Sequence, residues 1–360
     1  MGVRELLIEF KRRTDTFKFR AEKGVVALVL KDTTIGSKGK NLVFNSIRDV
    51  VDSDFTEDNY NYIRLAFMGN PNKVMVEVID DFTSDSKDLT KGLKSLELKR
   101  FSYMAIPELP SEKNTEVEAW VSSQRKLGKV IKAVLNGVTA SNESSLINFT
   151  TDGIKTRDSE KTYTALQYTP RIAGLLAGLP STQSSTFSVL SEVYECNVSD
   201  NENTDIDSGK LILTNDGEKV KIARGVTAMT EVTPGEIEDF KKIKIRDTAD
   251  MIEADVRETW DDHYVGKVMN TYPNKQLFLN SVKGYLNNLQ KEGILDPSKI
   301  VEVDIDIEEN IKYLKEKGEK DPSEMELQEI KEANTGAHLF AYADIRIADA
   351  MEDLKLKFYM

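Results

Sequence analysis

Five short and almost uninterrupted apolar runs in the first half of the chain place the strongest limit on its fold. In chain order they are Val25–Leu30, Val74–Ile79, Tyr103–Ile106, Val130–Leu135 and Leu146–Phe149. A strand with one face in water alternates apolar and polar residues, whereas a strand covered on both faces is apolar throughout. The runs therefore predict a sheet that is covered on both faces.

Helical patterns separate the first four runs. They are Asn59–Met68, Ser84–Leu98 and Thr115–Leu127, each with apolar residues at helical spacing. Alternation of strand and helix is typical of βαβ units and a mostly parallel sheet. We predict an α/β domain that begins at Lys23 and is regular to about Thr150.

The middle of the chain is less regular. Pro170–Leu179 is a short apolar helix, and the polar segment Ser199–Ser208 is predicted to be a surface loop. Strand-like residues flank Asn215-Asp216-Gly217 on both sides. Glycine allows the positive φ of a tight turn, so this spacing predicts a hairpin.

The pattern changes near residue 230. Pro234–Val268 is predicted to be mostly helical, with an extended start at Lys242–Ile245, and Asn274–Lys291 is a second helix. The remaining elements are a strand at Ile300–Ile307, a helix at Asp321–Ala333 and a strand at His338–Ile347. This part is predicted to be α+β, so the domains are 23–230 and 231–351.

Both ends of the chain have the period of two that marks a strand with one buried face. The apolar positions are Leu6, Ile8 and Phe10 at the start and Leu354, Leu356 and Phe358 at the end. A strand without a partner leaves a row of open backbone N–H and C=O groups. Two hypotheses follow: residues 1–22 and 352–360 are arms that add strands to other subunits, or both strands join the chain's own sheet.

Composition limits the partners. The net charge is −12 with a pI near 5, which disfavours non-specific binding to nucleic acid or anionic lipid. No run of 18 apolar residues occurs, the first residues do not form a secretory signal, and Cys196 is the single cysteine. We expect folding in the cytoplasm, no membrane insertion and no internal disulfide.

Histidine gives the strongest argument against catalysis. The two histidines are His263 and His338, so the α/β domain contains no histidine. It therefore cannot hold a Ser-His-Asp catalytic triad or a Cys-His catalytic pair. We predict no catalytic residue in this chain.

Three other candidate sites are better explained without a ligand. Gly36–Lys40 has too few residues between its glycines for a phosphate loop. Asn203, Asp205 and Asp207 lack the glycine and the final glutamate of a calcium loop. Asp304 and Asp306 lie on one outward strand face, where we expect them to protect a sheet edge. We predict no cofactor and no metal site.

Several segments, in order along the chain, resemble one known family. They are Leu146–Asp152, Arg171–Gly178, Gly209–Leu213, Ile222–Val226, Lys242–Thr248, Leu327–Gly336 and Asp349–Asp353. The chain is similar to the contractile tail sheath proteins of bacteriophages, and most of all to those of clostridial phage-tail-like (R-type) bacteriocins.

This resemblance implies a structural subunit in the tail of a virion or a phage-tail-like particle. The 23–230 domain would be an outer domain, similar to subtilisin in fold but catalytically inert, and the 231–351 domain would face the tail tube. Arms 1–22 and 352–360 would exchange strands between neighbours in a helical homopolymer of stacked six-fold rings. Its other partners would be the tail tube, baseplate and tail terminator proteins, and contraction would drive the tube through a bacterial envelope without nucleotide hydrolysis.

The resemblance also favours a tube contact near Ser323–Thr335. This segment has a polar face with Glu324, Gln328, Lys331 and Glu332, and its alternative role is a solvated cover. Two other functions stay open from the sequence: an α/β hydrolase, and a peptide-binding module that uses exposed strand edges.

Overall fold

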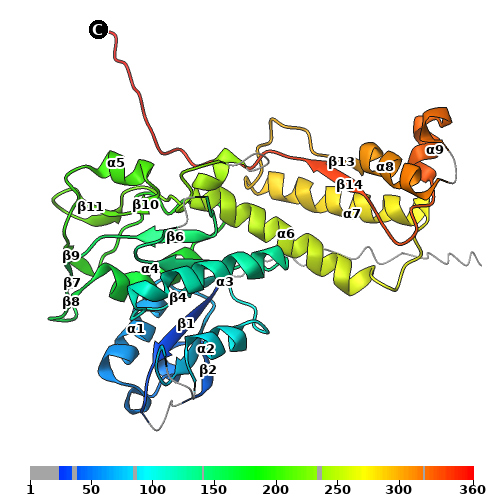
Figure 1. Cartoon of the computed structure of the whole chain (residues 1–360). Helices are drawn as coiled ribbons and strands as arrows, with labels where there is room; N and C mark the ends of the chain where they lie inside the picture. The colour runs from blue at the N-terminus through cyan, green and yellow to red at the C-terminus, as the bar shows by residue number, and fades with distance from the viewer. Residues whose placement is uncertain (1–23, 35–38, 84–86, 140–141, 233–236, 319–320) are drawn as a thin grey trace, which may run out of the picture. The chain divides into compact units, whose positions relative to one another are not determined.

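The predicted apolar runs lie side by side in one seven-stranded sheet of the computed structural model (Figure 1), which describes residues 24–34, 39–83, 87–139, 142–232, 237–318 and 321–360. The strands in spatial order are β10 (Lys210–Leu211), β6 (Leu146–Phe149), β5 (Lys132–Leu135), β4 (Tyr103–Ala105), β1 (Val25–Lys31), β3 (Lys73–Ile79) and β2 (Asn41–Phe44). All neighbours pair in parallel except β2, which pairs antiparallel with β3 at one edge. The mostly parallel sheet is therefore confirmed.

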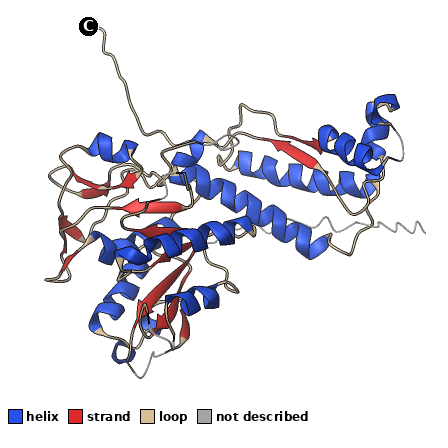
Figure 2. Ribbon diagram, viewed as in Figure 1, coloured by secondary structure: helices blue, strands red, loops and turns tan. Residues whose placement is uncertain are grey.

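Helices cover both faces of this sheet (Figure 2). They are α1 (Glu57–Met68), α2 (Leu89–Leu96), α3 (Asn114–Lys126) and α4 (Ala165–Gly178). Along β1, Val26, Leu28 and Leu30 belong to the core shared with α1 and α4, whereas Ala27 and Val29 belong to the core shared with α2 and α3. Burial on both faces explains why the strand sequences do not alternate.

Helices α1 and α4 approach each other through glycine. A Cβ atom at Gly174 would lie 2.0 Å from the carbonyl oxygen of Ala66, and one at Gly178 would lie 1.8 Å from that of Gly69. Any side chain would overlap the opposite backbone, so the spacing of Gly174 and Gly178 sets this close contact.

Smaller elements lie between and after the main strands along the chain. They are β7 (Ile154–Thr156), β8 (Thr162–Tyr163), β9 (Val193–Glu195), α5 (Glu202–Asp207), β11 (Leu213–Asn215), β12 (Val220–Ile222) and the 3₁₀ turns η1 (Ile47–Asp49), η2 (Asp52–Asp54), η3 (Ser111–Lys113) and η4 (Glu238–Lys241). The hairpin around Gly217, whose φ is +92°, is confirmed as β11–β12. The prediction of a loop throughout Ser199–Ser208 is wrong, because residues 202–207 form α5.

The C-terminal part contains the other elements. They are α6 (Ile243–His263), α7 (Tyr272–Lys291), β13 (Glu302–Ile305), α8 (Ile307–Lys317), η5 (Pro322–Glu324), α9 (Leu327–Glu332) and β14 (Ala341–Asp344). The predicted extended start at Lys242–Ile245 is wrong, since α6 begins at Ile243. The helix predicted at Asp321–Ala333 is divided into η5 and α9, with Met325 extended between them.

The chain divides into two compact units, which we describe separately. Among the described residues, the sheet unit contains 24–251 and Asp349–Met360, and the helical unit contains Ile252–Ala348. The division therefore falls inside α6, whereas the sequence pattern placed it near residue 230. The start of α6 belongs to the sheet unit because Asp247 and Asp250 bind side chains of the sheet strands.

In the helical unit, aromatic rings join α6 to α7. Trp260 stacks on Tyr264 with ring centroids 5.7 Å apart, and Phe278 meets both rings edge-on. The Tyr285 hydroxyl donates to Asp255 at 2.6 Å. Strands β13 and β14 form a separate two-stranded antiparallel sheet in the same unit.

Candidate assembly site

The last twelve residues form an arm with two different halves. Residues 349–353 are held against the sheet unit by ion pairs, whereas residues 354–360 are exposed and have neither helix nor strand in the described structure. The exposed fractions of Leu354, Leu356 and Phe358 are 85%, 63% and 81%. The final strand expected from their alternation has not formed in the single chain.

The first half of the arm, which we call the arm base (residues 349–353), carries three carboxylates. Arg224 contacts two of them, with Nη2 at 2.6 Å from Asp353 and Nε at 3.4 Å from Glu352. Ser184 donates to Glu352 at 2.7 Å, and Lys242 pairs with Asp349. The hydrogen bond to Asp353 raises the pKa of Arg224, and the hydrogen bond to Asp349 raises the pKa of Lys242.

Sequence reasoning missed the residues that hold the arm base. The available signal was the group of acids at 349, 352 and 353 directly before the alternating apolar residues. The residues predicted for the N-terminal arm, Leu6, Ile8 and Phe10, lie outside the described residues.

The residues predicted to contact a tube lie on η5 and α9. Glu324, Gln328 and Glu332 are exposed, and Gln328 donates to Glu332 at 2.6 Å. Lys331 instead pairs with Asp304 of β13, which raises the pKa of Lys331, so its charge is already matched within the chain. Ile330 is buried and orients this short helix.

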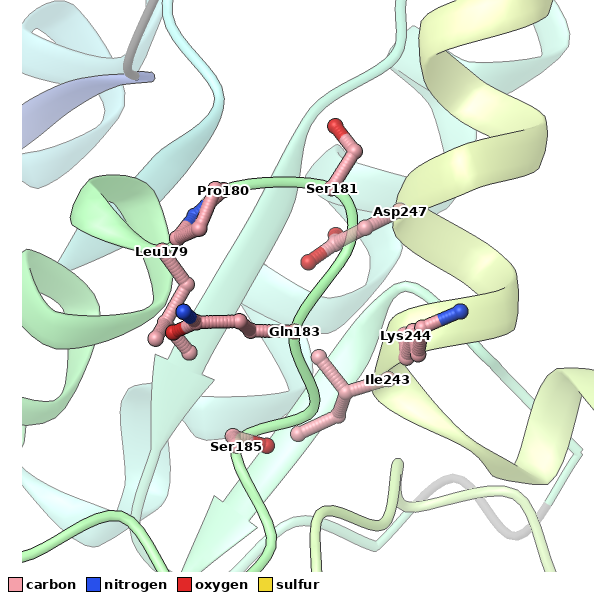
Figure 3. Close-up of a pocket in the computed structure, with 8 residues that line it drawn as sticks. All are labelled: Leu179, Pro180, Ser181, Gln183, Ser185, Ile243, Lys244 and Asp247. Carbon is pink, nitrogen blue, oxygen red and sulfur yellow. The ribbon is translucent and has the colours of Figure 1, made fainter. Parts of the chain in front are cut away.

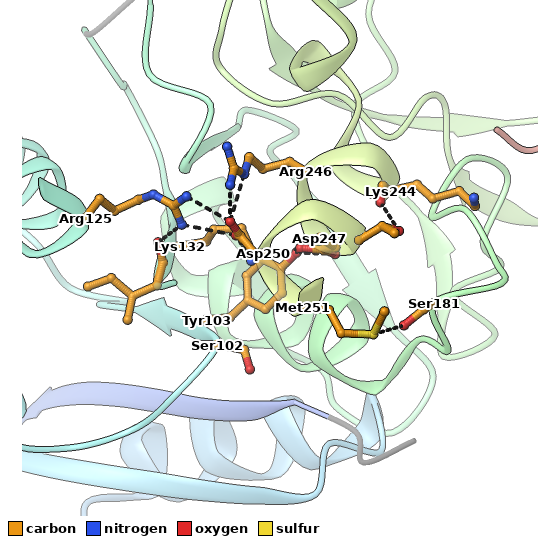
Figure 4. Close-up of polar contacts among 12 residues, drawn as sticks. Ser102, Tyr103, Arg125, Lys132, Ser181, Lys244, Arg246, Asp247, Asp250 and Met251 are labelled. Atoms are coloured by element: carbon orange, nitrogen blue, oxygen red, sulfur yellow. Dashed lines mark hydrogen bonds and ion pairs between the residues drawn. The ribbon is translucent and has the colours of Figure 1, made fainter. Parts of the chain in front are cut away.

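A cluster of charged side chains lies at the amino ends of β4 and β5 (Figure 4). Lys132 of β5 lies 3.0 Å from Asp247 and 2.7 Å from Asp250, both on α6. Tyr103 of β4 donates to Asp247 at 2.6 Å. Burial, reinforced by Asp247, raises the pKa of Tyr103 well above its usual value.

Asp250 also accepts from two arginines. Arg125 lies at 2.8 Å, and Nε of Arg246 donates at 2.9 Å. Burial alone would raise the pKa of Asp250, but Lys132 and Arg125 hold it well below its usual value. Ligands of open α/β sheets bind at the carboxyl ends of the strands. Because this cluster lies at the opposite ends, we interpret it as an anchor of α6.

One small cavity lies next to this cluster (Figure 3). It is lined by Leu179, Pro180, Ser181, Gln183, Ser185, Ile243, Lys244 and Asp247 and has a volume of about 40 Å³. A cavity of this size holds water molecules but no organic substrate.

The other polar candidates have structural partners. Asp205 lies on α5 and binds Lys210 and Ser199, which lower its pKa. Asp306 caps α8 by accepting from the Glu309 amide. Gly36 of the glycine and lysine loop lies outside the described residues.

The described residues also contain no group of three or more His, Cys, Asp or Glu side chains that could hold a metal ion. His263 ends α6 and His338 stacks on Phe340, so both belong to the helical unit. Burial raises the pKa of the Cys196 thiol to about 11. No helix among the described residues combines the length and apolar character needed to cross a bilayer.

Comparison with known proteins adds to this geometry. Residues 236–360 match the family described as the phage tail sheath C-terminal domain. The tail sheath protein of Clostridium phage phiCD119 is 36% identical over 373 residues, which cover 100% of this chain and 99% of that protein.

Solved sheath proteins share the fold. A sheath tail protein from Desulfitobacterium hafniense aligns with a TM-score of 0.69 at 14% identity, over 83% of this chain and 93% of its own. A sheath tail protein from Listeria innocua aligns with a TM-score of 0.66 at 15% identity, over 90% of this chain and 95% of its own. A chain from the helical sheath of the anti-feeding prophage, in its contracted state, aligns with a TM-score of 0.67 at 13% identity, over 100% of this chain and 99% of its own. With the whole-chain match to the clostridial phage protein, these findings establish that the chain belongs to the phage tail sheath protein family.

Proposed function

We propose that this chain is the repeating subunit of a contractile sheath, which polymerises helically around a tail tube and contracts to drive the tube through a bacterial envelope. The observation that carries the proposal is the C-terminal arm. Its tip exposes Leu354, Leu356 and Phe358 in alternation, and no strand among the described residues pairs with it. An apolar strand edge without a partner in its own chain is suited to strand addition in a polymer.

The two-stranded sheet of β13 and β14 is the acceptor that we propose on a neighbouring subunit. Its outer edges have no strand partner in the described part of the chain, and three of the four β14 residues are exposed. A hairpin of two strands is marginally stable alone, so added strands would stabilise it. Residues 1–22, with Leu6, Ile8 and Phe10, are proposed as the second added strand.

We assign the roles of the domains by the same reasoning. The α/β part, 23–230, is the outer domain, subtilisin-like in topology and without catalytic function. The part from 231 to 351 is the inner, tube-facing domain, with residues 352–360 as the arm. The placement of both histidines in the helical unit supports an inert outer domain.

The tube contact is proposed for η5 and α9, through Glu324, Gln328 and Glu332. These side chains are exposed and polar, and polar rim contacts are weaker than buried apolar ones, which suits a sheath that must release its tube. Lys331 contributes less to this contact because it already pairs with Asp304. Further partners are the baseplate and tail terminator proteins, and the subunit folds in the bacterial cytoplasm before assembly.

Electron microscopy of the purified chain with and without residues 354–360 tests the proposal. The full chain should form tubes or rings at high concentration, and the shortened chain should stay monomeric with an unchanged circular dichroism spectrum. Normal tubes from the shortened chain would refute the role of the arm. An α/β hydrolase would instead be labelled stoichiometrically by a serine-hydrolase probe.

A further inference from the structure

The sign of the charge along the C-terminal arm reverses between residues 353 and 355. The arm base contains Asp349, Glu352 and Asp353, and the tip contains Lys355 and Lys357 between its apolar residues. The surface beneath the arm base has the opposite sign, because Arg224 and Lys242 bind the carboxylates there. Lys244 adds a third positive charge that acts on Asp349 and Glu352.

We infer that this acidic arm base and the basic surface form an electrostatic clasp that fixes where the arm leaves the subunit and holds its tip ready for strand addition. Arg224 and Lys242 are the positioning residues of the clasp. The inference rests on the proposed role of the arm in assembly.

The geometry favours a clasp over scattered surface ion pairs. The Glu352 side chain is only 11% exposed and is bound by both Arg224 and Ser184. The guanidinium of Arg224 spans Glu352 and Asp353, so one rigid group holds two neighbouring residues of the arm. Asp349 is held separately by Lys242, which fixes both ends of the arm base.

The charge reversal sets the end of the clasp. No acidic side chain follows Asp353 in the arm, so the attraction to the basic surface ends there, and Lys355 and Lys357 add none. The tip is exposed, with Leu354, Leu356 and Phe358 facing solvent. Strand addition must order the arm, and this ordering costs conformational entropy. Because the clasp already orders the arm base, less entropy is lost on association, which favours binding.

The mobility of the arm tests the clasp directly in the full-length monomer. With Cys196→Ser as background, a spin label is placed at Met351→Cys in the arm base or at Phe358→Cys in the tip. We expect the label at 351 to move several-fold more slowly than the label at 358. The Arg224→Glu/Lys242→Glu variant, or a high salt concentration, should bring the two labels to the same mobility.

The Lys155→Glu variant is the matched control, since Lys155 forms an exposed ion pair with Glu195 elsewhere on the sheet unit. It should leave both labels unchanged. Equal mobility of the two labels in the wild-type background would overturn the clasp.

Assembly tests the positioning role. We expect the Arg224→Glu/Lys242→Glu variant to raise the critical concentration for polymerisation about fivefold, the effect of a few exposed ion pairs. The charge swap Lys242→Asp with Asp349→Lys should restore the wild-type value, whereas Lys242→Asp alone should not.

The two proposals can fail separately. Polymerisation at the wild-type concentration despite a mobile arm base would overturn the positioning role. Polymerisation without residues 354–360 would instead refute strand addition by the arm, and the label at 351 would still report on the clasp.

Discussion

The ammonium of Lys132 lies 2.7 Å from Asp250, and each side chain is only 4% exposed. Lys132 is the first residue of β5 and Asp250 lies in the third turn of α6, so this pair joins the sheet to the helix that continues into the helical unit. Removing one partner of such a pair leaves an uncompensated buried charge.

The first prediction concerns this ion pair. Asp250→Asn should lower the free energy of unfolding by about 3–5 kcal/mol, because it removes the carboxylate that Lys132, Arg125 and Arg246 share and leaves Asp247 as the remaining acid beside Lys132. Chemical denaturation measures this change. Glu195→Gln, which breaks the exposed pair with Lys155, is the control and should have a much smaller effect, because solvent screens this pair. Equal effects of the two substitutions would contradict the anchoring role of the cluster.

The second prediction concerns pH. The pKa of Asp250 is lower in the folded than in the unfolded chain, so as pH falls the unfolded chain binds this proton first. The stabilisation by Asp250 is therefore complete above about pH 4 and is lost progressively below it. Burial raises the pKa of Asp247, which acts in the opposite direction.

The informative quantity is thus the difference in unfolding free energy between the wild type and Asp250→Asn. It should shrink as the pH is lowered from about 6 to about 3. A difference that stays constant over this range would show that the Asp250 carboxylate is not stabilised by its cations.

The third prediction concerns the contact of α1 with α4. Gly174→Ala should destabilise the chain by about 3 kcal/mol or more, because the new Cβ would overlap the backbone of Ala66. Gly284→Ala in α7 is the control, since nothing besides its chain neighbours and the backbone of its own helix lies within 4 Å of a Cβ there. It should stabilise its helix by up to about 1 kcal/mol. Thermal unfolding measures the stability of both variants. A Gly174→Ala variant as stable as the wild type would contradict the close contact of α1 with α4.

The fourth prediction concerns the arm tip. Leu356→Asp should leave the monomer as stable as the wild type, because Leu356 is 63% exposed, and should abolish polymerisation by placing a charge in the added strand. Lys357→Gln, on the opposite face of the strand, should still polymerise. Sedimentation and electron microscopy separate the two outcomes, and tubes of normal length from Leu356→Asp would exclude this strand register.

The fifth prediction concerns the tube. Glu324→Lys combined with Glu332→Lys should weaken binding of the sheath to its tube while tube-free sheath polymers still form. Glu160→Lys with Glu218→Lys makes the same change of charge on exposed residues of the sheet unit. Co-sedimentation with tubes compares the variants. Equal tube binding by both would move the contact elsewhere in the inner domain.

Much of the sheet unit could be predicted from the sequence because its signals are local. Strands buried on both faces must be apolar throughout, so Val25–Leu30 and Val74–Ile79 indicated β1 and β3 before their neighbours were known. The turn at Gly217 needs positive φ, which glycine supplies wherever the chain folds. The amphipathic pattern of α7 likewise follows from its own residues.

Only the tertiary structure decided which distant residues meet. The acids at 349–353 gave no sign that Arg224 and Lys242 would bind them, and the closeness of Gly174 to Ala66 depends on how two helices cross. Lys132 and Asp250 are separated by 118 positions, so no local pattern could pair them. Local propensity and hydrophobic period act over a few residues, so the sequence by itself determined the main strands and helices of the sheet unit. Ion pairs and helix contacts depend on the completed chain path, so only the folded chain determined the anchor of α6 and the clasp of the arm.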